Sequence, residues 1–238
     1  MADVLQSRHR NLLLSRLDQA DYALLAPYLE PFAADRSLIF CQVGEPISHA
    51  IFLDDGCASM VAISPEGQRV EAGLFGFEGF GCTVLAIGDD RSTYFGTIQL
   101  PGSGYRIAVE RLHAAMEASG SLRDRLQRFA YVMSIQSGFT ALSNAVHPIE
   151  ERLARWILMC DDRVASGVLR LTHKFMSVML AVRRPSVTTA LHVLEGNGFI
   201  RSTRGIVEVT NRAALEDFAA DAYGKPEREY ARLLGPIR

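Results

Sequence analysis

The chain has 238 residues, of which 48% are hydrophobic and 22% are charged, and its formal net charge is −2. These proportions are those of an ordinary globular protein and exclude a disordered or fibrous chain. The length suits two domains of about 100 to 150 residues each. No apolar run approaches the ~18 residues of a membrane span, and the N-terminal stretch lacks a cleavage signal. We therefore expect a cytoplasmic protein that has a sizeable core and no contact with a membrane.

The four cysteines, Cys41, Cys57, Cys82 and Cys160, stand singly, without a Cys-x-x-Cys pair or a nearby histidine cluster. This spacing indicates neither a zinc site nor an iron–sulfur cluster, so we expect buried reduced thiols. The chain also lacks a Walker loop, a GxGxxG motif and a Ser-His-Asp set in context. The sequence therefore predicts no metal, no cofactor, no catalytic residue and no enzymatic activity.

In chain order, residues 11–30 look helical and residues 36–109 read as short strands. Runs such as SLIFCQ, AIFLD, SMVAIS and FGTIQL are β-branched or aromatic, and turn sequences such as GEP, DDG and PGSG divide them. Many short strands at this spacing predict a small antiparallel barrel or sandwich.

A long helix is predicted from Ser121, with Ser121 as its N-cap and Asp124 reciprocating, to the stop at His147-Pro148. Two apolar lines run along it: Leu122, Leu126, Phe129, Met133 and Gln136 form one, and Val132, Ile135, Phe139, Leu142 and Val146 form the other. One line can pack on the strand domain while the other meets a second copy of the chain. The pattern therefore favours a homodimer, and a single broad core face is the alternative.

A new helix is predicted after Pro148, with Glu150 and Glu151 near its positive end, so a domain boundary lies near His147. The last residues read as a short polar helix or a frayed end. The expected organisation is a β domain over residues 1–120, the long helix over 121–147, a third unit over 148–222 and a tail over 223–238.

The sequence pattern of residues 171–200 predicts a helix-turn-helix, in which Thr172 caps the first helix and Pro185 occupies position N1 of the second. On a helical wheel around Val187, the apolar side holds Ala190, Leu191 and Leu194, and the polar side holds Pro185, Ser186, Thr188, Thr189 and His192. The following GNGFIRSTRGIVEVT gives a glycine-rich stop and two strands around Arg204-Gly205, which form a wing.

Charge supports a contact between this segment and a polyanion. From Arg163 to Arg212, eight basic residues against two acidic ones give a local net charge of +6. The second helix of such a motif enters the major groove with its N-terminus first, so its first turn meets bases and phosphates. The alternative to DNA binding is that this segment is only the solvent-exposed start of a helix. The sequence predicts contacts to double-stranded DNA from Arg183, Arg184, Ser186, Thr188, Thr189, His192, Arg201 and Arg204.

The stretch LTHKFMSVMLAVRRPSVTTALHVLEGNGFIRSTRGIVEV resembles the winged helix-turn-helix of the Crp/Fnr family of bacterial transcription regulators. EERLARWILMC and GEPISHAIFLDDGCASMV match as well, so the resemblance covers nearly the whole chain. It implies an α+β fold with an N-terminal antiparallel β-roll like that of cyclic-nucleotide-binding domains, a long dimerisation helix and a C-terminal winged helix-turn-helix. It also implies a homodimeric regulator on a palindromic operator, with RNA polymerase as a candidate partner.

Two positions depart from the family pattern. Ala181 stands where the turn usually has glycine, which costs about 1 kcal/mol if the residue needs a positive φ. Pro185 stands where an acidic base reader often sits, which puts the usual DNA consensus in doubt.

The effector candidates are Glu78, Arg91 and Ser92, by resemblance to the Gly-Glu and Arg-Ser/Thr-Ala contacts of cyclic-nucleotide binders. Their separation is thirteen residues where the family has about ten, and DDRSTYF looks more like a hairpin turn than a phosphate cradle. We therefore favour a β domain that is a scaffold or senses another ligand. A regulator that responds to cyclic nucleotide, and a protein-interaction module with weak DNA binding, are the alternatives. No histidine or cysteine stands out as a haem ligand, and we expect His49, His113, His147, His173 and His192 to be surface residues that hold no haem.

Overall fold

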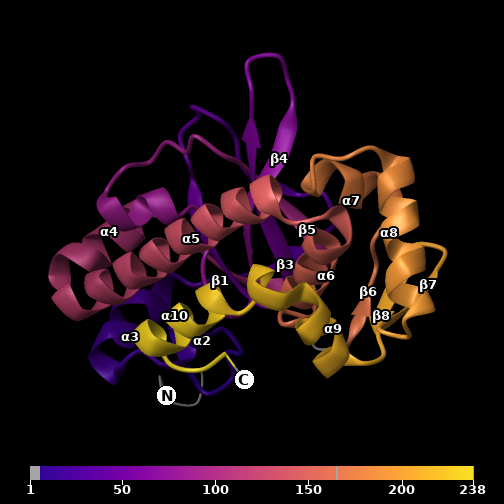
Figure 1. The fold of residues 1–238 in the computed structure, drawn as a ribbon. Coiled ribbons are helices and arrows are strands. Elements are labelled where there is room, and N and C mark those ends of the chain that lie inside the picture. Colours follow the sequence, from indigo (N-terminus) through magenta and orange to yellow (C-terminus); the bar gives the residue numbers. More distant parts are fainter. Residues whose placement is uncertain (1–5, 165, 238) are drawn as a thin grey trace.

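The N-terminal half of the chain is an antiparallel β-roll (Figure 1). The computed structural model describes residues 6–164 and 166–237. The strands pair in the order β1-β5-β3-β4, with β2 added to β5. Their bounds are β1 Glu30–Ala34, β2 Ile39–Cys41, β3 His49–Ile63, β4 Arg69–Phe75 and β5 Phe95–Ala108. Of the small antiparallel barrel or sandwich expected from the turn spacing, the structure shows a roll, in which the runs AIFLD and SMVAIS merge into the single strand β3.

Strands β3 and β5 are the two long central strands of the roll, and they pair from His49↔Ala108 to Val61↔Phe95 through several bulges. Gly56 lies in one of these bulges with φ +90°, and a Cβ there would come within 2.6 Å of the Leu100 carbonyl oxygen. Only glycine accepts both that backbone conformation and the close approach. The long strands can therefore bend at this point and close the roll.

Short helices cover the roll before the long helix begins. These are α2 Leu12–Ser15, α3 Gln19–Leu25, the 3₁₀ turns η1 Ala26–Tyr28 and η2 Thr83–Ile87, and α4 Val109–Ala118. Their apolar side chains join those of β3 and β5 in one core cluster. The helical expectation for residues 11–30 is thus confirmed for most of that segment, which ends in the first residue of β1.

The long helix α5 spans Gly120–Val146, and its N-cap is Ser119 rather than the predicted Ser121. The Ser119 hydroxyl accepts a hydrogen bond from the Leu122 amide at 3.2 Å. The Ser121 hydroxyl instead donates to the carboxylate of buried Asp21 at 2.7 Å. The Ser119 hydroxyl donates to the same carboxylate, so Asp21 holds both serines at the start of the helix.

The two apolar lines of α5 have different environments. The line from Leu122 to Gln136 is buried against the β-roll throughout. In the other line only Val132 is buried, and Leu142 and Val146 are 47% and 63% exposed. One face of the helix therefore belongs to the core, and the described residues leave the C-terminal end of the other face, at Leu142 and Val146, exposed.

The C-terminal part is a helical bundle with a three-stranded sheet in the order β6-β8-β7. Its elements are α6 Ile149–Asp161, β6 Val168–Leu169, α7 His173–Met179, α8 Arg184–Gly196, β7 Ile200–Thr203, β8 Ile206–Val209, α9 Arg212–Ala219 and η3 Ala220–Ala222. The sequence did not reveal β6. The core of this part includes Cys57, Val61, Leu74 and Leu100 from the β-roll, so the two halves share one apolar interface.

The C-terminal segment forms helix α10, Lys225–Leu234, which crosses back to the β-roll beside α5 (Figure 1). Tyr230 is 2% exposed, and its hydroxyl donates to the Glu78 carbonyl at 2.8 Å. The segment expected as a short polar helix or a frayed end is therefore a helix with one buried face. No helix in the described part of the chain combines the length and the hydrophobicity that a bilayer crossing requires.

Candidate nucleic-acid interface

Helices α7 and α8 form the predicted helix-turn-helix. Thr172 caps α7 by accepting a hydrogen bond from the Phe175 amide at 3.2 Å, as the sequence predicted. The turn contains Ala181 with φ 50°, so alanine here holds a left-handed conformation that favours glycine. Helix α8 begins at Arg184 with Arg183 as N-cap, so Pro185 is its second residue and not its first. The one-residue error leaves Pro185 in the first turn, where no helical hydrogen bond needs its missing N–H.

Helix α8 has one buried face and one open face. Val187, Ala190, Leu191 and Leu194 are at most 1% exposed, as predicted. The opposite face shows its polar side chains to solvent: Arg183, Arg184, Pro185, Thr189 and His192 are exposed, and Ser186 and Thr188 are half-buried. The predicted binding residues of this helix therefore lie together along its leading end and its outer side.

Two of the hydroxyls on α8 have partners inside the motif. Thr188 donates to the Arg184 carbonyl at 3.3 Å and hydrogen-bonds to His173 Nδ1 at 2.9 Å. Thr189 donates to the Pro185 carbonyl at 3.2 Å but stays exposed. Thr188 and His173 thus tie α8 to α7. The sequence missed this contact because it joins two helices and follows no local pattern.

Strands β7 and β8 form the predicted wing, with Thr203 opposite Ile206 and Arg204-Gly205 at its tip. Glu195 Oε1 accepts a hydrogen bond from the Ser202 amide at 2.8 Å, which fixes the wing to the end of α8. Arg201 lies 3.8 Å from Glu208 across the hairpin, whereas Arg204 is exposed at the tip. The wing therefore holds its tip arginine in a set position relative to the helix.

The local charge of +6 overstates the positive surface. Arg163 is 3% exposed and pairs with Glu78 at 2.7 Å, and Arg212 contacts Asp161, Asp162 and Glu216. Among the described residues, Arg183, Arg184 and Arg204 have no ion pair. Unpaired positive charge therefore remains at the start of α8, at the wing tip and, nearer α7, at exposed Arg170 and Lys174.

The structure does not bring the three effector candidates together. Glu78 is 1% exposed, and its carboxylate accepts hydrogen bonds from Arg163 Nε at 2.7 Å and from the Gly76 amide at 2.9 Å. Arg91 is exposed and donates to the Gly44 carbonyl at 2.7 Å, while buried Ser92 accepts a hydrogen bond from the Tyr94 amide. In the described residues no hydrogen bond or ion pair links Glu78 to Arg91.

The space beside Glu78 is almost filled by the protein itself. The cavity between Glu78, α5 and α10 is about 10 Å³, at the lower limit for a single water molecule. The Phe129 ring lies so close to Gly79 that a Cβ on this glycine would be 1.8 Å from it. Side chains of α5 and α10 therefore occupy the region that faces Glu78.

Residues 151–218 match the family model of the Crp-like helix-turn-helix domain. No curated protein matches the chain. Among solved structures, a putative Crp/Fnr transcriptional regulator from Eubacterium rectale superposes with a TM-score of 0.67 at 14% identity, covering 87% of this chain and 97% of the other. FixK2 from Bradyrhizobium japonicum gives 0.66 at 17% identity, covering 81% and 98%. The c-di-GMP responsive regulator CLP of Xanthomonas campestris gives 0.64 at 14%, covering 81% and 99%.

These matches define a class: the chain has the fold of the DNA-binding transcription regulators of the Crp/Fnr type. More particularly, it carries a Crp-like helix-turn-helix domain at residues 151–218. The resemblance and the α+β fold class inferred from the sequence are thereby confirmed.

Proposed function

We propose that the protein is a transcription regulator that reads a palindromic operator as a homodimer, through α8 and the wing. The observation that carries this proposal is the pair of exposed, unpaired arginines, Arg183 and Arg184, at the leading end of a helix whose other face is buried. A helix presented in this way enters the major groove with its first turn near base edges. The adjacent hydroxyls and His192 add donors and acceptors on the same face.

In this proposal Arg184 and Arg204 contact different parts of the DNA. Arg184 can reach guanine O6 and N7 with two parallel donors, whereas Arg204 at the wing tip meets phosphates. Arg184→Ala should then cost about 1–3 kcal/mol on the specific site and relax preference at one base pair per half-site. Arg204→Ala should weaken specific and random DNA alike and reduce the salt slope by about one.

Salt titrations of both variants against selected and scrambled duplexes test this assignment. The selected duplex comes from rounds of binding to a random DNA pool. If Arg184→Ala loses equal affinity for both duplexes, Arg184 contacts the DNA phosphates and not the bases. Ser186, Thr189 and His192 would then be the residues that contact the bases. Undiminished binding in both variants would refute the proposed interface altogether.

The homodimer is supported by the open face of α5. Leu142 and Val146 are exposed, and Ile135 and Phe139 are half-buried, along one line of the helix. A two-fold axis along this line would bury them against the same residues of a second copy. In the proposed organisation, residues 121–147 form this seam, residues up to 120 form the β-roll unit and residues 148–222 form the DNA-binding unit. Light scattering should report about twice the chain mass of 26.2 kDa.

We further propose that cyclic nucleotide does not control the protein. The paired, buried Glu78 and the filled space beside it support this view. Calorimetry with cyclic AMP and cyclic GMP should give dissociation constants no better than about millimolar. A micromolar constant that is lost in Arg91→Ala would restore the cyclic-nucleotide switch. RNA polymerase remains a candidate partner, and we propose no enzymatic activity.

A further inference from the structure

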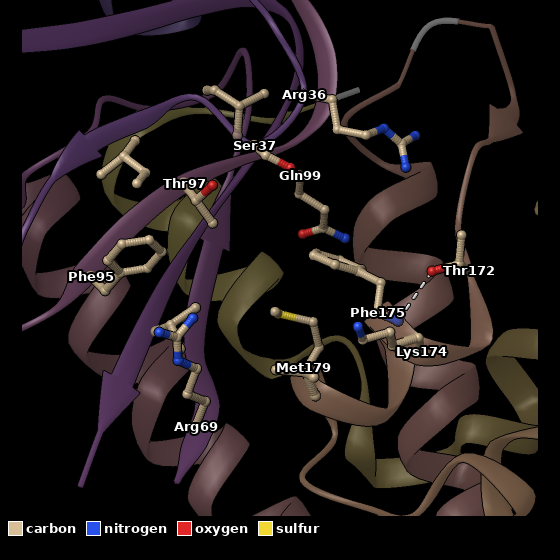
Figure 2. A pocket seen from close by; sticks show the side chains of 14 residues that line it. Arg36, Ser37, Arg69, Phe95, Thr97, Gln99, Thr172, Lys174, Phe175 and Met179 are labelled. Carbon is tan, nitrogen blue, oxygen red and sulfur yellow. Dashed lines mark hydrogen bonds between the residues drawn. The ribbon is translucent and has the colours of Figure 1, made fainter. Parts of the chain in front are cut away.

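A cleft, which Glu78 does not line, separates the β-roll from helix α7 (Figure 2), and its volume is about 480 Å³. Strands β2 to β5 form one side, and residues 172–179 form the other. This volume lies within the ~300–1,000 Å³ typical of small-molecule sites. The cleft is thus large enough for an organic ligand of about a dozen heavy atoms.

The walls of the cleft combine apolar surface with positive charge. Phe95 on the β-roll side faces Phe175 and Met179 of α7 across the gap (Figure 2). Arg36, Arg69 and Lys174 contribute three cationic groups, and no carboxylate lines the cleft among the residues that the structure describes. Such walls suit a ligand with an apolar body and an anionic group.

The cations differ in how far the protein itself satisfies them. Arg36 donates to the Arg170 carbonyl at 2.6 Å, and the Arg69 guanidinium lies 5.4 Å from the centre of the Phe95 ring. Lys174 is exposed and has no ion pair within the described chain, whereas Lys225, the chain's other lysine, lies 3.7 Å from Glu229. Arg69 and Lys174 are therefore the groups best placed to bind an anion here.

The floor of the cleft connects to the second half of the protein. Gln99 is 2% exposed, and its amide nitrogen donates to Cys160 Sγ of α6 at 3.2 Å. Its Oε1 accepts from the Ser59 hydroxyl at 2.5 Å. A ligand in this cleft would touch the β-roll, α7 and the polar residue that links the roll to α6.

We propose that this cleft binds a small amphipathic carboxylate, with the carboxylate at Arg69 and Lys174 and an aryl or acyl body between Phe95, Phe175 and Met179. Since α7 both lines the cleft and packs on α8, an occupied cleft would hold the helix-turn-helix against the β-roll and change its affinity for DNA. The binding site stands on the cleft alone. The effect on DNA rests on the proposed function.

Calorimetry of the full chain with decanoate and with indole-3-acetate tests the site and separates acyl from aryl ligands. We expect at least one probe to bind with a submillimolar dissociation constant, the range for about a dozen heavy atoms at modest ligand efficiency. Decanol and indole, which lack the carboxylate, should bind at least about ten-fold more weakly. Equal affinity for the neutral probes would reduce the site to apolar adsorption, and no binding of either carboxylate would overturn it.

Matched variants locate the bound probe. Arg69→Gln and Lys174→Gln should each weaken binding about three- to ten-fold. Arg111→Gln removes an arginine that lies 4.5 Å from the Tyr28 ring, a similar cation–π contact elsewhere, and Lys225→Gln removes the other lysine. Both controls should bind as the wild type does. Unchanged affinity in Arg69→Gln and Lys174→Gln would place the probe outside the cleft and refute the proposal.

A cleft-filling variant, Val178→Trp, should abolish probe binding while its circular dichroism stays that of the wild type. If that variant fails to fold, the Arg69 and Lys174 variants alone decide. Titration of DNA with and without the probe then tests the coupling. A probe that binds but leaves DNA affinity unchanged refutes the coupling and keeps the site. A chain that binds the probe but no DNA refutes the proposed function and not the cleft.

Discussion

The wild type should lose stability as the pH rises above the ordinary pKa of Glu71, 4.5, and replacing Glu71 by glutamine should remove this loss. Glu71 lies on β4 and is 4% exposed, and its carboxylate accepts a hydrogen bond from Trp156 Nε1 of α6 at 2.9 Å. Burial raises the pKa of this carboxyl to about 7, although hydrogen bonds from Ser59 and Trp156 and the positive charges of Arg155 and Arg163 oppose the shift. The group therefore titrates near neutral pH.

The Ser59 hydroxyl lies between two acceptors, Glu71 and Gln99. The Ser59 hydroxyl lies 2.6 Å from Glu71 Oε2 and 2.5 Å from Gln99 Oε1, but it has a single proton to donate. A protonated Glu71 can donate to Ser59, which then donates to Gln99. Glutamine at position 71 can donate from its amide in the same direction. With Glu71 ionised, Ser59 can donate to only one of the two, and if it donates to Glu71, Gln99 Oε1 keeps only the weak donor Cys57 Sγ at 3.9 Å.

The sign of the pH effect follows from the raised pKa. Between the ordinary value of 4.5 and the folded value of about 7, the folded chain keeps a proton that the unfolded chain has lost. The stabilisation is fully present below pH 4.5 and is lost as the pH rises through 7. The shift corresponds to about 3 kcal/mol at most. Glu71→Gln should thus match the wild type near pH 4 and exceed its free energy of unfolding by up to about 3 kcal/mol at pH 8.

Urea unfolding at a series of pH values from about 4 to 8 measures this difference. Trp156 is the only tryptophan of the chain, so its fluorescence also reports the titration directly, with a midpoint near 7 in the wild type and none in Glu71→Gln. Glu66→Gln, an exposed carboxyl in the turn before β4, is the matched control and should leave both measurements unchanged. Parallel stability profiles for Glu71→Gln and the wild type would refute the reasoning.

Three further predictions concern the turn, the interface of the two halves and the dimer. Ala181→Gly should raise the free energy of unfolding by about 0.5–1 kcal/mol, because glycine adopts φ 50° without the strain that alanine has there. Thermal unfolding measures the change, and a lower melting temperature for the variant would contradict the presence of strain at Ala181. Arg163→Met should cost about 3–5 kcal/mol in urea unfolding by leaving Glu78 buried without its partner, and adding Glu78→Gln should recover part of this loss. Leu142→Asp should yield monomers in light scattering, and a stable dimer in that variant would place the seam elsewhere.

The helix-turn-helix could be predicted closely because its signals are local. Thr172 caps α7 within three residues, and the spacing of Val187, Leu191 and Leu194 fixes the buried face of α8 without reference to the rest of the fold. The wing follows from two short strands around Arg204-Gly205. The errors here are of one residue, since a cap position can move by one without changing the apolar pattern.

Features that depend on distant residues could not be predicted. Glu78 and Arg163 are 85 residues apart in the chain, and α10 packs on the β-roll from the opposite end of the sequence. The cysteines look isolated in the sequence, yet Cys57 and Cys160 both contact Gln99. A single sequence has no periodicity that reports such contacts, because each depends on the fold that brings the residues together.

The buried ion pair of Glu78 with Arg163 links the two halves of the protein. A buried carboxylate is costly without a cation, and the structure supplies one from the residues that follow α6 rather than from its own domain. Tyr230 of α10 donates to the backbone of the same residue, so three segments meet at Glu78. A ligand that competed for this carboxylate would have to break a buried ion pair and displace Phe129 from Gly79. The open cleft at α7 requires neither step, and control of the proposed regulator through the β-roll is therefore easier to reconcile with a ligand bound there.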